Sequence, residues 1–240
     1  MAVSLDPVRI AVVGQENCGK SSLINALRGE VNAQVDVLPV VGDTTVYTYS
    51  IDGFEHLHLV ELPAIEGGTA KIDELVSELT ESDIVIWMLK ANQPARALDT
   101  ELCSQFEKYY RGEDSLQKKQ PILVGVLSHV DMLSPASEWN PPYDLGETGV
   151  EKVRAINDAL QYNQQVLSFD TIIPVSVASD KSHYNLADVM TWLDQSYQAA
   201  VQVQLNRRGR EARQRDWNAT EQGKRLARMG KALFGKIVRG

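Results

Sequence analysis

The hydrophobic positions along the chain follow two patterns, one typical of buried strands and the other of amphipathic helices. Continuous apolar runs and strict alternation predict strands, because a strand in a parallel sheet is buried on both faces. Apolar residues at three- and four-residue spacing predict helices between them. The predicted strands are residues 8–13, 46–51, 56–62, 84–89, 122–128 and 171–177. The predicted helices are residues 22–27, 72–79, 100–110, 149–162 and 186–203.

This alternation predicts an α/β fold of the doubly wound type, in which helices flank a mostly parallel sheet. Asp52 and Gly53 lie between two predicted strands and indicate a tight hairpin turn. Residues 36–43 are expected to form a loop. A chain of 240 residues can bury one core and still have length left for an appendage.

Charge divides the chain into two parts. Residues 206–240 contain eleven Lys or Arg and three acidic residues, whereas residues 1–205 contain 13 basic and 29 acidic residues. The net charges are therefore +8 and −16. We expect a boundary near residues 200–206, between a body over 1–205 and a basic tail over 206–240.

Residues 223–239 of the tail predict an amphipathic helix. Its apolar side contains Leu226, Met229, Leu233, Phe234, Ile237 and Val238, and its basic side contains Lys224, Arg225, Arg228, Lys231 and Arg239. Such a helix is typical of segments that bind an anionic membrane surface or an acidic protein partner. Packing against the acidic body and binding to RNA are the alternatives. Three glycines each lower helix propensity by about 1 kcal/mol, so we expect this segment to order on contact.

The remaining composition indicates a cytosolic protein. Cys18 and Cys103 lack the spacing of metal ligands, which favours reduced thiols over a disulfide framework. No secretory signal is recognised, and no apolar run reaches the roughly 18 residues that a membrane-spanning helix needs. We therefore expect a cytoplasmic location, with the basic tail able to hold the protein at the inner face of the membrane.

Residues 14–21, Gly-Gln-Glu-Asn-Cys-Gly-Lys-Ser, carry the strongest chemical signal. They match the phosphate-binding pattern Gly-x-x-x-x-Gly-Lys-Ser/Thr, and they lie between a predicted strand and a predicted helix as that pattern requires. Main-chain N–H groups and the helix N-terminus attract phosphate, Lys20 reaches the β- and γ-phosphates, and Ser21 ligates Mg²⁺. The sequence therefore predicts a site for a nucleoside triphosphate. The candidate residues are Gly14, Gln15, Glu16, Asn17, Cys18, Gly19, Lys20, Ser21 and Ser22.

Over residues 8–200 the order of motifs resembles an Era-like P-loop GTPase with a Ras-like fold. Such domains read guanine with Asn/Thr-Lys-x-Asp, and this chain has Ser128-His129-Val130-Asp131 at that place. Asp131 would accept from both N1–H and the 2-amino group of guanine, which selects GTP over ATP. The resemblance further implies that the ring of His129 packs on the base and that Ser128 bridges to the phosphate loop. Ser176, Val177 and Ala178 resemble the loop whose main-chain N–H meets guanine O6.

The two switch segments of the family are also recognisable. Thr45, or Thr44 as the second choice, would complete the coordination of Mg²⁺ when the γ-phosphate is present. Glu61-Leu62-Pro63-Ala64 replaces the family's Asp-Thr-Pro-Gly. Glu61 would reach a magnesium-bound water, and Ala64 would offer its N–H to the γ-phosphate with less freedom to flip than glycine has.

The resemblance implies that hydrolysis needs another source of catalysis, because the usual water-positioning residue is missing. Ile65 stands where Ras-like proteins have a water-positioning Gln. Asn17 resembles the potassium-coordinating Asn of cation-dependent GTPases that are activated by homodimerisation through the nucleotide face. This implies slow hydrolysis in isolation, with Lys20, Asn17 and Thr45 as the candidate catalytic residues and K⁺ as a second cation. Glu66 and the Gly67-Gly68 pair are alternatives for placing the water.

Two rival functions are compatible with the same motifs. The rivals are a P-loop ATPase or kinase, and a GTP-loaded scaffold that does not turn over; a ribosome- or RNA-associated GTPase is a further alternative.

Residues 133–144 form a Pro- and aromatic-rich insertion that resembles the YfjP-type group of GTPases. We expect a rigid extended loop anchored by Trp139 and Tyr143, with partner binding as the alternative.

Overall fold

The computed structural model describes residues 6–30, 35–39, 45–51, 54–111, 118–147, 149–178 and 183–237. Its strands are β1 Val8–Gly14, β2 Val35–Pro39, β3 Thr45–Ile51, β4 Phe54–Glu61, β5 Ile84–Lys90, β6 Ile122–Ser128 and β7 Ile172–Pro174. They form one seven-stranded sheet in the order β2-β3-β4-β1-β5-β6-β7. The five strands from β4 to β7 are parallel to one another, and β2 and β3 extend the sheet by antiparallel pairing.

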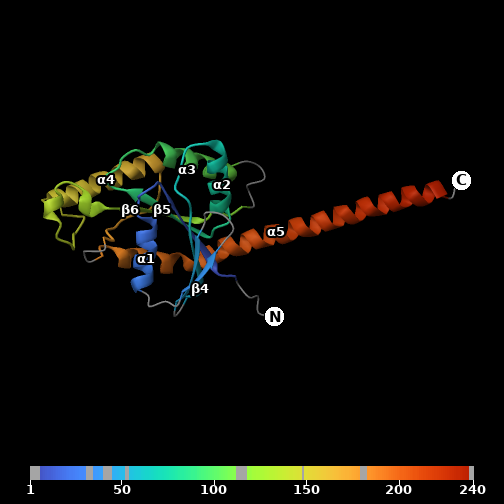
Figure 1. The fold of residues 1–240 in the computed structure, drawn as a ribbon, viewed down its shortest axis with the longest axis horizontal. Helices are drawn as coiled ribbons and strands as arrows, with labels where there is room; N and C mark the ends of the chain where they lie inside the picture. The colour runs from blue at the N-terminus through green and yellow to red at the C-terminus, as the bar shows by residue number, and fades with distance from the viewer. Residues whose placement is uncertain are drawn as a thin grey trace.

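Helices cover both faces of this sheet. They are α1 Lys20–Glu30, α2 Thr69–Thr80, α3 Ala97–Tyr109, α4 Glu151–Leu167 and α5 Leu186–Ile237. Helices α2, α3 and α4 lie on one face, and α1 and the start of α5 lie on the other (Figure 1). Successive residues of β1 alternate between the two faces, so Ile10 and Val12 join the core under α1 and α5, whereas Ala11 and Val13 join the core under α2 and α3. The predicted doubly wound α/β fold is therefore confirmed.

Two predicted features of the backbone were wrong. Residues 36–43 were expected to be a loop, but residues 35–39 form edge strand β2, which pairs with β3 from Val35 opposite Tyr49 to Pro39 opposite Thr45. A proline at the end of an edge strand is tolerated because its nitrogen need not donate a hydrogen bond to the sheet. The sequence pattern did not predict this strand because proline usually argues against one. Strand β7 ends at Pro174, not residue 177. The predicted turn at Asp52 and Gly53 lies outside the described residues.

The last helix also differs from the prediction. Two separate helical segments were expected, with a boundary near residues 200–206, but α5 runs without interruption through 52 residues. The chain has no proline beyond Pro174, so nothing in this region removes a helical hydrogen bond. The division into a body and a tail stays a prediction, and the side chains of the predicted amphipathic segment lie outside the described residues.

Only the first part of α5 packs on the body. Val189, Ala200, Val201 and Val203 are buried, whereas residues 211–218 are all exposed. Beyond its packed part the helix projects away from the rest of the molecule (Figure 1). Within the described part of the chain, none of the helices combines the length and hydropathy required to cross a bilayer.

Candidate nucleotide-binding site

The phosphate loop joins β1 to α1, and its shape is determined by tight packing against β5. A Cβ atom at Gly14 would lie 2.6 Å from the carbonyl oxygen of Met88 and 2.7 Å from Sγ of Cys18, so no larger residue fits there. Gly19 has a φ of +90° and Asn17 a φ of +55°, both in the left-handed region where glycine and asparagine are favoured. The residues of the motif thus match the backbone that they adopt.

The charged and hydroxyl groups of the motif gather at one cavity of about 350 Å³. Lys20 Nζ donates to the carbonyl oxygens of Gly14 at 3.1 Å and Gln15 at 3.2 Å. These contacts hold an ammonium group where phosphate oxygens could take over its hydrogen bonds. The cavity is lined by Asn17, Cys18, Gly19, Lys20, Ser21, Ser22, Glu61, Lys90 and His129.

Two oxygen-bearing side chains meet at the edge of this cavity. Ser21 Oγ donates to Glu61 Oε1 at 2.6 Å, and the backbone of Thr45 pairs with Glu61 across β3 and β4. A hydroxyl and a carboxylate are hard oxygen ligands of the kind that Mg²⁺ prefers. The pair therefore fits the predicted magnesium site. The side chain of Thr45 and the whole of Thr44 lie outside the described residues.

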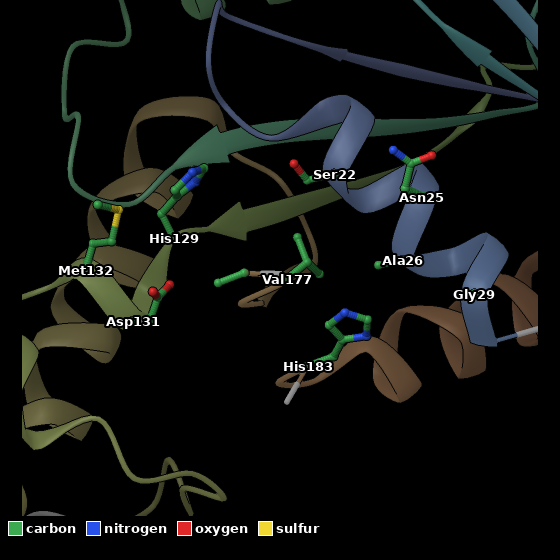
Figure 2. A pocket seen from close by; sticks show the side chains of 10 residues that line it. Ser22, Asn25, Ala26, Gly29, His129, Asp131, Met132, Val177 and His183 are labelled. Carbon is green, nitrogen blue, oxygen red and sulfur yellow. The ribbon is translucent and has the colours of Figure 1, made fainter. Parts of the chain in front are cut away.

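A second, larger cavity of about 680 Å³ lies beside the first between α1 and the ends of β6 and β7. Figure 2 shows Asp131, Val177 and His183 around this space, with Ser22, Asn25 and Ala26 of α1 on its other side. Ser22 and His129 line both cavities, so the two spaces adjoin. The lining residues are Ser22, Asn25, Ala26, Gly29, His129, Asp131, Met132, Val177, Ala178 and His183.

Asp131 is held rigidly at this second cavity. Its side chain is 8% exposed, and Oδ1 accepts from Ser176 Oγ at 2.9 Å. The fully buried Lys152 donates to the main-chain oxygen of Asp131 at 2.8 Å and to that of Leu133 at 2.5 Å. Ser176 therefore acts on the site through Asp131, and only Val177 and Ala178 of its loop reach the cavity.

Ser128 and His129 connect the second cavity to the phosphate loop. Ser128 Oγ donates to the carbonyl oxygen of Cys18 at 2.6 Å, which is the bridge expected for a residue in this place. Ser128 Oγ also lies 2.8 Å from Nδ1 of His129. His129 has a φ of +58°, and its ring packs against Gly19. Burial, together with Lys90, lowers the pKa of His129, which favours the neutral imidazole at pH 7.

The segment after β4 folds back onto the phosphate loop. The N–H of Ile65 donates to the carbonyl oxygen of Gly14 at 3.1 Å, and the side chain of Ile65 is buried in the core. It therefore points away from the cavity and offers nothing to a water there. Ala64 is half-buried and does not line the cavity, and Glu66 is exposed and paired with Lys71.

The aromatic insertion is anchored beside the site. Trp139 and Tyr143 both pack on Tyr184, with ring centroids 5.4 Å and 6.0 Å apart. Tyr184 in turn exchanges main-chain hydrogen bonds with Ser176, so the insertion supports the segment that carries Ser176 and His183. The anchoring roles of Trp139 and Tyr143 are confirmed, although residues 136–138 form a short 3₁₀ helix instead of extended chain.

Several lining residues were not foreseen from the sequence. Lys90 ends the buried strand β5, and a charge at the carboxyl end of a parallel strand was a signal that could have found it. Asn25, Met132 and His183 carry no such signal, because they reach the cavity from α1, from the short 3₁₀ helix Val130–Met132 and from the segment before α5. Six of the predicted and described residues lie outside both cavity linings, namely Gly14, Gln15, Glu16, Ala64, Ser128 and Ser176.

Comparison with known proteins agrees with this architecture. A family model described as "50S ribosome-binding GTPase" matches residues 9–127. GTPase Der from Sulfurihydrogenibium sp. is 30% identical over 114 residues, which cover 44% of this chain and 26% of Der. GTPase Era from Ruminiclostridium cellulolyticum is 25% identical over 172 residues, which cover 70% of this chain and 48% of Era. The chain thus spans between 26% and 48% of the length of these two relatives.

The fold has a solved counterpart. The crystal structure of Aquifex aeolicus Era bound to GDP and AlF4⁻ superposes with a TM-score of 0.51 and 17% sequence identity, covering 79% of this chain and 56% of Era. At this identity the likeness concerns the fold alone. The phosphate loop, the order of the sheet and these matches support the assignment of the chain to the Era-like P-loop GTPases.

Proposed function

We propose that this chain binds GTP and hydrolyses it to GDP and phosphate as a nucleotide-controlled switch. The observation that carries the proposal is the pair of adjoining cavities. One is lined by the phosphate loop and the other by Asp131, and both share Ser22 and His129. A triphosphate in the first cavity would bring its base into the second, where the Asp131 carboxylate matches the two N–H donors of guanine.

The chemistry would be attack of water on the γ-phosphate in line with the leaving group. Lys20 would exchange its two main-chain acceptors for phosphate oxygens, and the amides of the loop would stabilise the developing charge. Ser21 would hold Mg²⁺, which the family generally uses, with Glu61 reaching a magnesium-bound water and Thr45 as a further predicted ligand. That ion neutralises charge on the β- and γ-phosphate oxygens when it is bound.

We further propose that hydrolysis depends on K⁺ and on a second copy of the chain. Ile65 is buried and no side chain at that position reaches the attacking water, so another source of catalysis is needed. Asn17 is exposed at the mouth of the phosphate cavity, where its amide oxygen could hold a monovalent cation. A homodimer through the nucleotide face would enclose that position.

Release of phosphate over many turnovers tests these proposals. We expect turnover with GTP and not ATP, faster in K⁺ than in Na⁺, and a rate per molecule that rises with protein concentration. Equal rates in K⁺ and Na⁺ at every concentration would remove the cation and dimer from the mechanism. Tight GTP binding with no turnover under any condition would favour the scaffold, and equal use of ATP would favour the ATPase or kinase.

For the tail, we propose contact with an anionic membrane surface from the cytoplasmic side. The projection of α5 and the exposure of residues 211–218 support this, because these residues do not pack on the acidic body. RNA is the second candidate, since one structural neighbour is Era in complex with nucleotides of 16S ribosomal RNA. The resemblance to the YfjP-type group stays a prediction.

A further inference from the structure

A buried carboxylate contacts the phosphate loop without lining the phosphate cavity. Asp99, in the first turn of α3, is 1% exposed. Its Oδ1 accepts from the indole N–H of Trp87 at 2.8 Å, and its Oδ2 accepts from the side-chain amide of Gln15. Gln15 belongs to the phosphate loop, so Asp99 joins that loop to β5 and α3 although 84 residues separate the two in sequence.

The polar neighbours of Asp99 favour its charged form, although burial outweighs them and leaves its pKa raised. Both hydrogen-bonding partners are donors, the N-terminal end of α3 is nearby, and the buried Arg96 is an adjacent cation. Burial raises the pKa of Asp99, and the hydrogen bonds from Trp87 and Gln15 oppose that rise. Arg96 also fixes the end of β5, since its guanidinium donates to the carbonyl oxygens of Lys90 and Gln93.

The Gln15 side chain uses both of its N–H groups. Nε2 donates to the carbonyl oxygen of Ala95 at 2.9 Å as well as to Asp99, so rotation of the amide would break both contacts. The main-chain oxygen of Gln15 is one of the two acceptors of Lys20. Fixing this side chain therefore fixes the part of the loop that orients Lys20 and the amides after it.

We infer that Asp99 is a positioning residue for nucleotide binding, which holds the phosphate loop in its anion-binding shape through Gln15. The inference rests on the proposed function of the loop. Asp99 is not among the residues that line the phosphate cavity, so we expect it to act through Gln15 and not by contact with the nucleotide. Loss of the contact frees the Gln15 side chain and lets the loop relax, so the cost falls on phosphate affinity.

Exchange of the two side chains tests the inference. In the Asp99→Asn variant, the new amide group faces the amide of Gln15. In the Gln15→Glu variant, a second carboxylate faces that of Asp99. In the double variant the introduced amide can donate to the introduced carboxylate while its oxygen still accepts from Trp87. We expect each single variant to weaken the affinity for Mg·GDP by about tenfold or more, and the double variant to recover part of that loss, because the carboxylate of Gln15→Glu cannot donate to the carbonyl oxygen of Ala95.

Calorimetric titration with GDP, on samples shown to be folded by circular dichroism, supplies the measurement. Asp73→Asn, an exposed acid on α2, is the matched control for the change of charge and should bind GDP like the wild type. If the wild type binds GDP and all variants equal it, or if the double variant is as weak as the sum of the singles, the inference is overturned. If the wild type binds no guanine nucleotide, the proposed function fails first and the inference fails with it.

Discussion

At the scale of single residues, the site shows how an altered motif keeps its connections. Ser128 replaces a larger amide or threonine, yet its hydroxyl bonds to the carbonyl oxygen of Cys18 and approaches His129. The ring of His129, which stands in place of the lysine of the family motif, packs beside Gly19. Asp131, the residue that would read the base, keeps its partner Ser176 and its buried setting.

Replacing Asp131 by Asn should change the base that is preferred. The amide keeps an oxygen for Ser176, so we expect the protein to stay folded. It presents one donor and one acceptor, which matches xanthine better than guanine. We expect GDP affinity to fall by about 1.5–3 kcal/mol, roughly 10- to 100-fold, with a gain for xanthosine diphosphate. Titration with both nucleotides checks this, and unchanged selectivity would remove Asp131 from base recognition.

Replacing Ser21 by Ala should uncouple nucleotide affinity from Mg²⁺. Ser21 is exposed, so its loss should alter the free energy of unfolding by no more than about 0.5 kcal/mol. In the wild type we expect removal of Mg²⁺ with EDTA to weaken GTP binding. In the variant, GTP should already bind more weakly and respond less to EDTA. Ser104→Ala, at an exposed position of α3, is the control and should keep the full response.

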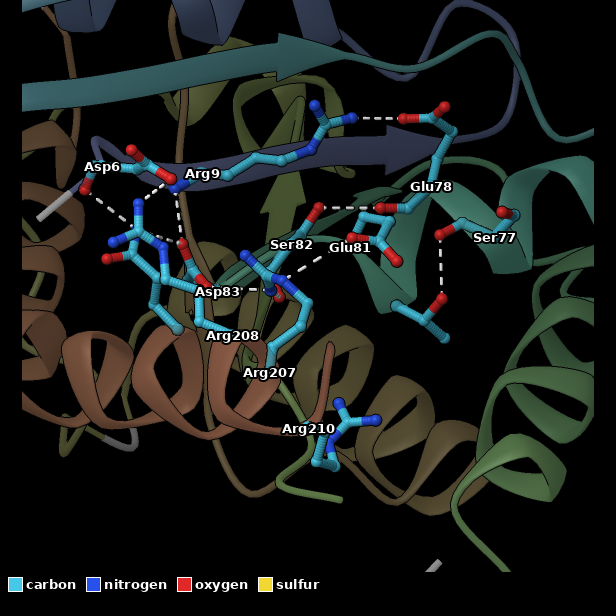
Figure 3. A network of polar contacts seen from close by, with 12 residues as sticks. Asp6, Arg9, Ser77, Glu78, Glu81, Ser82, Asp83, Arg207, Arg208 and Arg210 are labelled. Atoms are coloured by element: carbon cyan, nitrogen blue, oxygen red, sulfur yellow. Dashed lines mark hydrogen bonds and ion pairs between the residues drawn. The ribbon is translucent and has the colours of Figure 1, made fainter. Parts of the chain in front are cut away.

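At the scale of secondary-structure elements, ionic contacts attach α5 to the body at the point where the helix leaves it. Its packed segment ends in a cluster of ionic contacts with the start of β1 and β5 (Figure 3). Arg207 pairs with the fully buried Asp83 at 3.0 Å and with Glu81 at 3.6 Å, and Arg208 pairs with Asp6. These contacts lie where the helix leaves the body, so they determine the direction in which it projects.

Replacing Arg207 by Ala should weaken this attachment. Asp83 would keep the N–H of Arg9 at 2.8 Å but would lose its cationic partner. A buried carboxylate without its cation is costly, and we expect the free energy of unfolding to fall by about 3 kcal/mol. Arg213→Ala, on the exposed part of the same helix, should change it by no more than about 0.5 kcal/mol. Urea denaturation measures the free energy of unfolding of both variants. Equal losses in the two would show that the Arg207–Asp83 pair does not stabilise the fold.

The same variant should be most destabilised at neutral pH. Burial raises the pKa of Asp83, and the N–H of Arg9 and the charge of Arg207 counter that rise. A carboxyl with a raised folded-state pKa contributes stability that is complete below its unfolded pKa and is lost as pH rises through the folded pKa. Without Arg207 the folded pKa of Asp83 rises further, so the difference from wild type should shrink on acidification. A constant difference between pH 7 and acid pH would contradict this.

At the scale of the whole molecule, an acidic body carries a helix that projects into solvent. Eight of the eleven basic residues of the tail lie beyond residue 211. Deleting residues 212–240 should leave the affinity for GDP unchanged within about twofold, because residues 211–218 are exposed and make no part of the site. It should abolish binding to phosphatidylserine vesicles, since each basic residue near an anionic surface contributes about 1 kcal/mol.

Flotation with neutral phosphatidylcholine vesicles is the control for that experiment. The intact chain should bind the anionic vesicles only, and less at high salt. Loss of GDP affinity on truncation would show that residues 212–240 support nucleotide binding by the body. Salt-sensitive binding to RNA without binding to vesicles would favour the RNA alternative for the tail.

Local pattern was enough to predict the parts of the site that are continuous in sequence. The phosphate loop, the strand before it and the helix after it follow from residues 8–27, because a phosphate is bound by consecutive main-chain amides whose conformation depends on nearby glycines. Most of the sheet was predictable for a similar reason, since strands buried on both faces are apolar throughout. Edge strand β2 was missed because it is short and ends in a proline.

Tertiary structure decided everything that joins distant segments. The base cavity takes its walls from α1, from the ends of β6 and β7, and from His183, and no local pattern relates these positions. The contact of Gln15 with Asp99, and the anchoring of Trp139 on Tyr184, depend on which strands are neighbours in the sheet. The groups that can bind a phosphate could be identified from the sequence alone. Only the fold decided which buried partners hold those groups in place, because such contacts form when the sheet brings separate strand ends to one edge.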